Sequence, residues 1–176
     1  MTALGIAAFW PGTTGARTSL RAACKPLILT PADVAGALGV PPAQVSMAPV
    51  ASSGIPPVRG KPPFKGKTFE CDWSLSAVSQ LGFGEGRVSL FVFATAAEAS
   101  RWFTAYTAGE APPCKKVSFA TTACLEVSPV PSGVFPLFQA LQDRIVVWVH
   151  MRQRPLDRRV LEALATKVLV RAPRVA

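Results

Sequence analysis

Residues 144–151 read Arg-Ile-Val-Val-Trp-Val-His-Met, and this stretch decides the fold. Apolar side chains lie on both of its faces, which is typical of a strand that is covered on both sides. Residues 87–94, Arg-Val-Ser-Leu-Phe-Val-Phe-Ala, have the same pattern. We therefore expect these two strands at the centre of a sheet.

Weaker strand signals surround these two stretches. In residues 67–76, apolar and polar side chains alternate, so one face of this strand is expected to be buried. Gly82, Gly84 and Gly86 mark a turn before the next strand. Further strands are expected at residues 44–50, 116–119, 123–128 and 135–141.

Three helices are predicted to flank these strands. Thr30-Pro31-Ala32-Asp33 opens the first with a capping residue, a proline and a carboxylate, and Gly39 ends it. Thr95-Ala96-Ala97-Glu98 opens the second, which is expected to reach about residue 107. The third, over residues 156–170, has an apolar stripe at helical spacing.

The element order predicts an α+β fold. We expect a single twisted, mainly antiparallel sheet with helices packed on one side, stapled by disulfides. The chain has 176 residues, of which 49% are hydrophobic and 16% charged, and this composition excludes whole-chain disorder. It contains no apolar run of about 18 residues, which excludes a protein with several membrane spans.

One domain is expected to account for most of the chain. We assign it to residues 22–171, with residues 172–176 as a tail. Residues 1–21 are a flexible arm or the remnant of a secretion signal, because a short apolar run is present without the basic segment that normally precedes it.

Four cysteines, Cys24, Cys71, Cys114 and Cys124, favour two disulfides in an oxidising compartment. There is no Cys-x-x-Cys spacing and only one histidine, so we expect no metal site. Three connectivities are possible and the spacing does not decide between them. We favour Cys24–Cys71 with Cys114–Cys124, and the alternative is four free thiols in a cytosolic protein.

The basic residues outnumber the acidic ones by 19 to 10, which gives a formal net charge of +9. One cluster, Arg59, Lys61, Lys65 and Lys67, lies in a Pro/Gly-rich segment that we expect to be a loop or hairpin tip. We select it as the ligand-binding segment, for an anionic ligand or an envelope partner, because loops on a rigid scaffold often carry binding residues. The alternative is an ordinary solvated surface. No nucleic-acid-binding motif is present.

Catalysis has little support in this sequence. A hydrolase or thiol enzyme would use His150, yet this residue lies in the apolar strand, where a half-buried structural histidine is expected. There is no G-x-S-x-G motif, and no cofactor motif either. Trp102 and Tyr106 are predicted to form part of a core stripe, with a carbohydrate-binding aromatic pair as the alternative.

A resemblance adds to this interpretation. Residues 24–34, Cys-Lys-Pro-Leu-Ile-Leu-Thr-Pro-Ala-Asp-Val, precede Gly39, and Cys71-Asp72-Trp73 follows later. This pattern resembles the small exported lipoproteins of unknown function found in actinobacteria. The resemblance implies a Cys24–Cys71 disulfide and a PsbP-like or kinase-sensor-like α+β fold. Lipidation of Cys24 is the alternative, although Arg21 stands where the lipoprotein signal has Leu.

These observations together predict an extracytoplasmic, non-catalytic binding or sensing domain of the cell envelope. A hydrolase or thiol enzyme using His150, and a binder of nucleic acid or another anionic polymer through scattered Lys and Arg residues, remain the alternatives.

Overall fold

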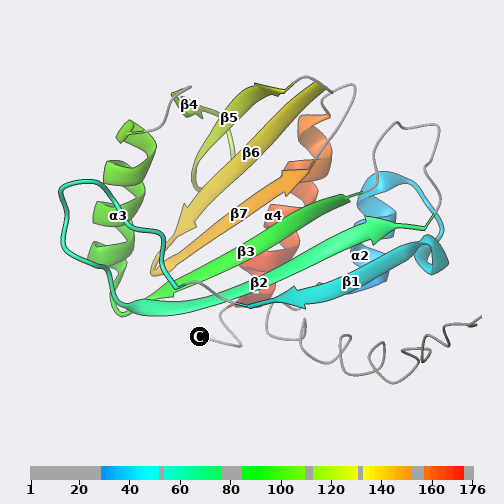
Figure 1. Ribbon diagram of the computed structural model, residues 1–176, viewed down its shortest axis with the longest axis horizontal. Coiled ribbons are helices and arrows are strands. Elements are labelled where there is room, and N and C mark those ends of the chain that lie inside the picture. Colours follow the sequence, from blue (N-terminus) through cyan, green and yellow to red (C-terminus); the bar gives the residue numbers. More distant parts are fainter. Residues whose placement is uncertain are drawn as a thin grey trace, which may run out of the picture.

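A seven-stranded antiparallel sheet forms the centre of the molecule (Figure 1). The computed structural model describes residues 29–51, 54–76, 85–109, 113–130, 133–151 and 157–172. The strands are β1 (Val45–Val50), β2 (Gly66–Leu75), β3 (Glu85–Phe93), β4 (Lys115–Lys116), β5 (Thr122–Val130), β6 (Gly133–Gln142) and β7 (Ile145–Met151). Their order in the sheet is β1-β2-β3-β7-β6-β5-β4. The two doubly apolar stretches, β3 and β7, are therefore central as predicted, and they are also neighbours.

Three helices pack on this sheet: α2 (Pro31–Leu38), α3 (Ala96–Gly109) and α4 (Arg158–Arg171). A short 3-10 turn, η2 (Pro42–Gln44), connects α2 to β1. The predicted α+β class and the single antiparallel sheet are thus confirmed. The predicted strand 116–119 is reduced to the two residues of β4 at the edge of the sheet.

The two faces of the sheet have different covers. On the first face, residues such as Val88 of β3 and Val149 of β7 lie opposite each other and pack against α2 and α4. On the second face, Phe91 and Val146 lie opposite each other and pack against α3. In Figure 1, α2 and α4 lie behind the strands, whereas α3 lies beside the ends of β3, β6 and β7.

The expectation that the helices share one side of the sheet therefore needs a correction. The helices α2 and α4 share one face, and α3 covers part of the other together with residues 54–65. The physical reason lies in the central strands, since β3 and β7 carry apolar side chains on both faces and both faces must be covered.

Gly86, which was expected in a turn, lies within β3. A Cβ atom at this position would come within 2.6 Å of the Trp73 ring and 2.7 Å of the His150 carbonyl oxygen. The missing side chain leaves the space that the Trp73 indole fills, so this glycine is required by close packing. Gly82 and Gly84 lie outside the described residues.

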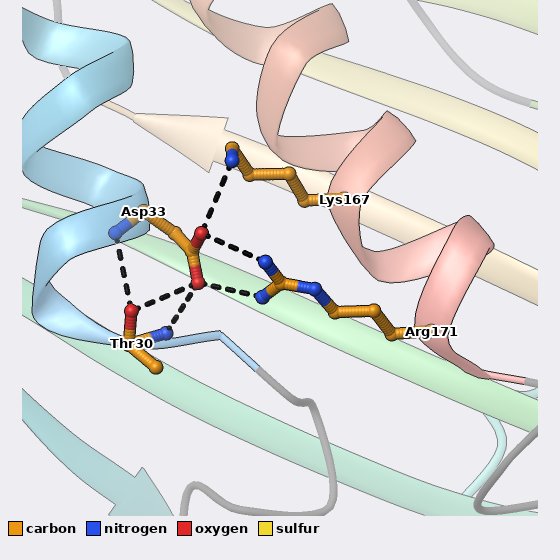
Figure 2. Close-up of polar contacts among 4 residues, drawn as sticks. All are labelled: Thr30, Asp33, Lys167 and Arg171. Carbon is orange, nitrogen blue, oxygen red and sulfur yellow. Dashed lines mark hydrogen bonds and ion pairs between the residues drawn. The ribbon is translucent and has the colours of Figure 1, made fainter.

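The helices α2 and α4 are joined by a buried carboxylate (Figure 2). Asp33 closes a capping box with Thr30 at the start of α2, as predicted. It also accepts two hydrogen bonds from the Arg171 guanidinium, at 2.7 and 3.1 Å, and lies 3.1 Å from the Lys167 ammonium. Burial alone would raise the pKa of Asp33, but the hydrogen bonds from Arg171, Thr30 and Lys167 outweigh it and hold the pKa well below its usual range.

The predicted Cys114–Cys124 disulfide is present and ties the chain before β4 to β5. Cys71 is also disulfide-bonded. Its predicted partner, Cys24, lies outside the described residues, so that pairing stays a prediction. The predicted arm, residues 1–21, lies outside them too, as do residues 173–176 of the predicted tail.

Replacing Cys114 and Cys124 together with Ser is expected to lower the free energy of unfolding by about 2–3 kcal/mol. The two cysteines are 10 residues apart, and opening this loop returns conformational freedom mainly to the unfolded chain. Urea denaturation of the double variant beside the oxidised wild type measures the difference. Equal midpoints and slopes for the two proteins would contradict this prediction.

Candidate ligand-binding site

Residues 54–65 form a strap that runs from β1 to β2 and crosses α3 (Figure 1). The Trp102 indole nitrogen donates a hydrogen bond to the Pro56 carbonyl oxygen of the strap at 2.9 Å. Apolar contacts fix it as well, since Phe64 meets Phe93 edge to face with ring centroids 6.4 Å apart. The strap is thus anchored to the α3 side of the sheet.

The anchor belongs to an aromatic core between α3 and the sheet. Trp102 is fully buried, stacks on Tyr106 at 4.8 Å and packs against Phe91, Phe93 and Trp148 at 5.5–5.6 Å between ring centroids. This confirms Trp102 as a core residue. The carbohydrate-binding pair is wrong for Trp102, because its ring presents no surface to solvent.

An open pocket of about 700 Å³ lies between the strap and α3. Its volume is within the range of roughly 300–1,000 Å³ that is typical of small-molecule sites. The apolar part of the lining comprises Val58, Pro62, Pro63, Phe64, Ala105 and Ala108. The small alanine side chains on α3 leave room that a larger residue would fill.

Three cations line this pocket, and they come from both of its walls. The strap contributes Arg59 and Lys61, and α3 contributes Arg101. Within the described part of the chain, the side chains of these three residues take part in no ion pair or hydrogen bond. Glu98 supplies one carboxylate to the lining. The pocket therefore has an excess of unpaired positive charge beside apolar surface, which attracts anions.

The predicted ligand-binding residues separate into two pairs. Arg59 and Lys61 meet at the pocket. Lys65 is exposed at the end of the strap, and Lys67 lies in β2 opposite Val92, on the face of the sheet that α2 and α4 cover. Neither Lys65 nor Lys67 lines the pocket.

Arg101 was not selected from the sequence, although a signal for it existed. The helix α3 buries Trp102 on one face. Positions 98, 101, 105 and 108 are three or four residues apart, so they lie together on a different face of the same helix. This face of α3 is the one that meets the strap. The sequence does not show that the strap lies there, because the hydrogen bond from Trp102 joins residues 46 positions apart.

A row of paired polar side chains lies on the face of the sheet that α3 partly covers, outside the area under α3. The Arg87 guanidinium donates two hydrogen bonds to the Asp72 carboxylate, at 2.6 and 3.1 Å, across β2 and β3. The Ser89 hydroxyl donates to Glu70 at 2.9 Å. These acids already have protein partners, so the row is typical of a solvated sheet face.

His150 lies opposite Arg87 in this row and is half-buried, as predicted. Desolvation, and secondly the charge of Arg87, lower the pKa of His150 from 6.5 to about 4, although Asp72 opposes them. The imidazole is therefore uncharged at neutral pH. Within the residues described, all cysteines are oxidised, so these residues offer His150 no thiolate.

Other candidate chemistry is also limited. No group of three or more His, Cys, Asp or Glu residues that could hold a metal occurs in the described segments. The sequence contains a second cluster of basic residues, which comprises Arg152, Arg154, Arg158 and Arg159. In this cluster Arg158 pairs with Glu162 at 2.6 Å and donates to the Ser118 carbonyl oxygen at 2.7 Å. Arg152 and Arg154 of that cluster lie outside the described residues.

Comparison with known proteins gives a likeness of fold. No protein-family model matches the chain, and no curated protein matches it. Among solved structures, the extracellular domain of PknH from Mycobacterium tuberculosis is similar, with a TM-score of 0.54 and 12% sequence identity. The match covers 88% of this chain and 96% of that domain. None of the described helices is both long enough and apolar enough to span a membrane.

Proposed function

We propose that this protein is an extracytoplasmic, non-catalytic binding or sensing domain that takes an anionic ligand in the pocket between the strap and α3. One observation carries the proposal: Arg59, Lys61 and Arg101 line this pocket without an ion-pair partner in the described chain. Cations that converge from two walls onto a partly apolar surface are typical of a recognition site for an anion.

Two further observations support the location. The Cys114–Cys124 disulfide is a bond that persists in oxidising compartments and is rare in the cytosol. The fold is similar to a domain that is itself extracellular, that of PknH. A domain outside the cytoplasm without a free thiol in its described part is suited to binding rather than to thiol chemistry.

The proposal is tested by titrating inorganic phosphate, as the simplest anionic probe, into the ¹⁵N-labelled protein at an ionic strength of about 0.15 M, where the Debye length is about 8 Å. We expect amide shifts around Arg59, Lys61 and Arg101. The double variant Arg59→Ser/Lys61→Ser should weaken binding by about tenfold, since each exposed charge contributes up to about 1 kcal/mol.

The matched control is Lys65→Ser/Lys67→Ser, which removes the same charge from outside the pocket. It should bind phosphate within about twofold of the wild type, because charges beyond the contact distance are largely screened. Equal weakening of phosphate binding by the two double variants would show that the affinity depends only on the net charge of the protein. The proposed site would then be wrong.

A further inference from the structure

We propose that the ligand of this pocket is an amphiphile, with one anionic head group and an apolar chain. This inference rests on the proposed function and names the class of ligand for the same site. Its basis is the joint presence of unpaired cations and an apolar wall in one pocket of about 700 Å³. An anion alone would use only the charged part of that lining.

The apolar wall has two sides. The strap contributes Val58, Pro62 and Phe64, and it is attached to the body of the protein by the hydrogen bond from Trp102 to Pro56 and by the contact of Phe64 with Phe93. The helix α3 contributes Ala105 and Ala108, which are three residues apart and therefore adjacent on its surface. Small side chains facing rigid apolar ones leave a groove in which a hydrocarbon chain can lose its contact with water. Burying only three methylene groups raises affinity by more than about tenfold.

The charges of the lining favour an anionic head group. Arg59 and Lys61 reach the pocket from the strap and Arg101 reaches it from α3, so an anion between the walls meets cations from both. Glu98 lines the same pocket, and its Oε2 atom is buried without a hydrogen-bond partner among the described residues. The three cations outnumber this carboxylate, so the lining keeps a net positive charge that attracts an anionic head group.

Calorimetric titration with three probes tests the inference: dodecyl phosphate below its micelle concentration, inorganic phosphate, and dodecyl maltoside. Dodecyl phosphate is expected to bind at least tenfold more tightly than either of the others. Arg59→Ser/Lys61→Ser should remove most of that gain. A parallel arm with phosphatidylglycerol vesicles distinguishes a lipid in a bilayer from a free amphiphile. Sedimentation with the vesicles that Arg59→Ser/Lys61→Ser abolishes and Lys65→Ser/Lys67→Ser retains indicates a lipid in a bilayer, whereas equal loss in both variants indicates attraction by the net charge of +9.

The variant Ala105→Trp tests the binding of the hydrocarbon chain separately from the binding of the head group. The indole should fill the apolar groove and weaken dodecyl phosphate at least tenfold more than it weakens inorganic phosphate, although Ala105 lies one helical turn from Arg101 and both affinities can fall. Ala97→Trp is the matched control, because Ala97 is an exposed residue of α3 outside the pocket lining. It should change neither affinity.

The outcomes distinguish the inference from the proposed function. If dodecyl phosphate binds no more tightly than phosphate, and both depend on Arg59 and Lys61, the amphiphile is wrong and the anion site stands. If dodecyl maltoside binds as tightly as dodecyl phosphate, the head group is not recognised and the inference also fails. If the affinity for none of the probes depends on Arg59 and Lys61, both the inference and the proposed function are wrong.

Discussion

Replacing Trp102 with Ala is expected to lower the free energy of unfolding by about 3–5 kcal/mol, which is the usual cost of truncating a fully buried large aromatic residue. Its ring contacts Phe91, Phe93 and Trp148 of the sheet, and Tyr106 of the same helix, so the contacts of α3 with the sheet would be lost together with one inside the helix. Urea denaturation followed by far-UV circular dichroism measures the loss. A cost below about 1 kcal/mol would show that α3 contributes little to the folded domain.

The variant Trp102→Phe separates the ring from its hydrogen bond. Phenylalanine keeps most of the buried aromatic surface but loses the donor to the Pro56 carbonyl oxygen. We expect a smaller stability loss of about 1–2 kcal/mol, with faster amide hydrogen exchange in residues 54–65. Unchanged exchange in the strap would contradict its anchoring by this bond, and the milder variant keeps the test valid if Trp102→Ala does not fold.

The central part of the fold could be predicted from the sequence because its signal is local. Apolar side chains on both faces of residues 145–151 require cover on both sides, and only a central strand of a sheet receives it. The capping box of Thr30 and Asp33 likewise involves residues three apart, so its geometry follows from the pattern.

The position of α3 could not be predicted in the same way. Its apolar stripe indicates a covered face, yet the stripe is identical whichever face of the sheet it packs on. The doubly apolar pattern of β3 and β7 did contain the information that both faces need a cover. What was missing is the path of the chain, which depends on contacts between distant residues.

The candidate site, too, could be predicted from the sequence only in part, because it depends on contacts between distant residues. The cluster of Arg59, Lys61, Lys65 and Lys67 is visible as charge in the sequence, but only the first two meet at the pocket. Lys67 is separated from them because β2 begins at Gly66 and fixes its direction by pairing with β3. Arg101 lines the same pocket through tertiary packing, although it follows Lys61 by 40 residues in the chain.

Replacing Asp33 with Ala is expected to lower the free energy of unfolding by about 3 kcal/mol. The carboxylate is only 7% exposed and accepts hydrogen bonds from Thr30 and Arg171, with Lys167 at 3.1 Å. Losing the helix cap accounts for about 1 kcal/mol, and the broken ion pairs for the remainder. The ion-pair part is smaller than for a fully buried pair, because Arg171 and Lys167 are 31% and 40% exposed and can be solvated.

The matched control is Asp72→Ala, which removes the same side chain from a more exposed ion pair. Asp72 is 46% exposed and pairs with Arg87 on the surface of the sheet. Exposed pairs contribute roughly 0–1 kcal/mol, so this variant should change stability by less than about 1 kcal/mol. Equal losses of stability in the two variants would show that the ion pairs between α2 and α4 stabilise the protein no more than an exposed ion pair does.

The pH dependence of the Asp33 effect provides a sharper test. Since the folded-state pKa of Asp33 is lowered below the value of 3.8 expected for the unfolded chain, its stabilisation is complete well above pH 3.8 and decreases as the pH falls below it. His150 also destabilises the folded state in acid, but between about pH 6.5 and 4, because its pKa is lowered to about 4. That contribution is common to the wild type and Asp33→Ala. The difference in the free energy of unfolding between these two proteins should therefore stay constant from pH 7 to about 5 and become smaller between pH 4 and 2. A difference that stays constant down to pH 2 would show that Asp33 does not act as a charged link between the two helices.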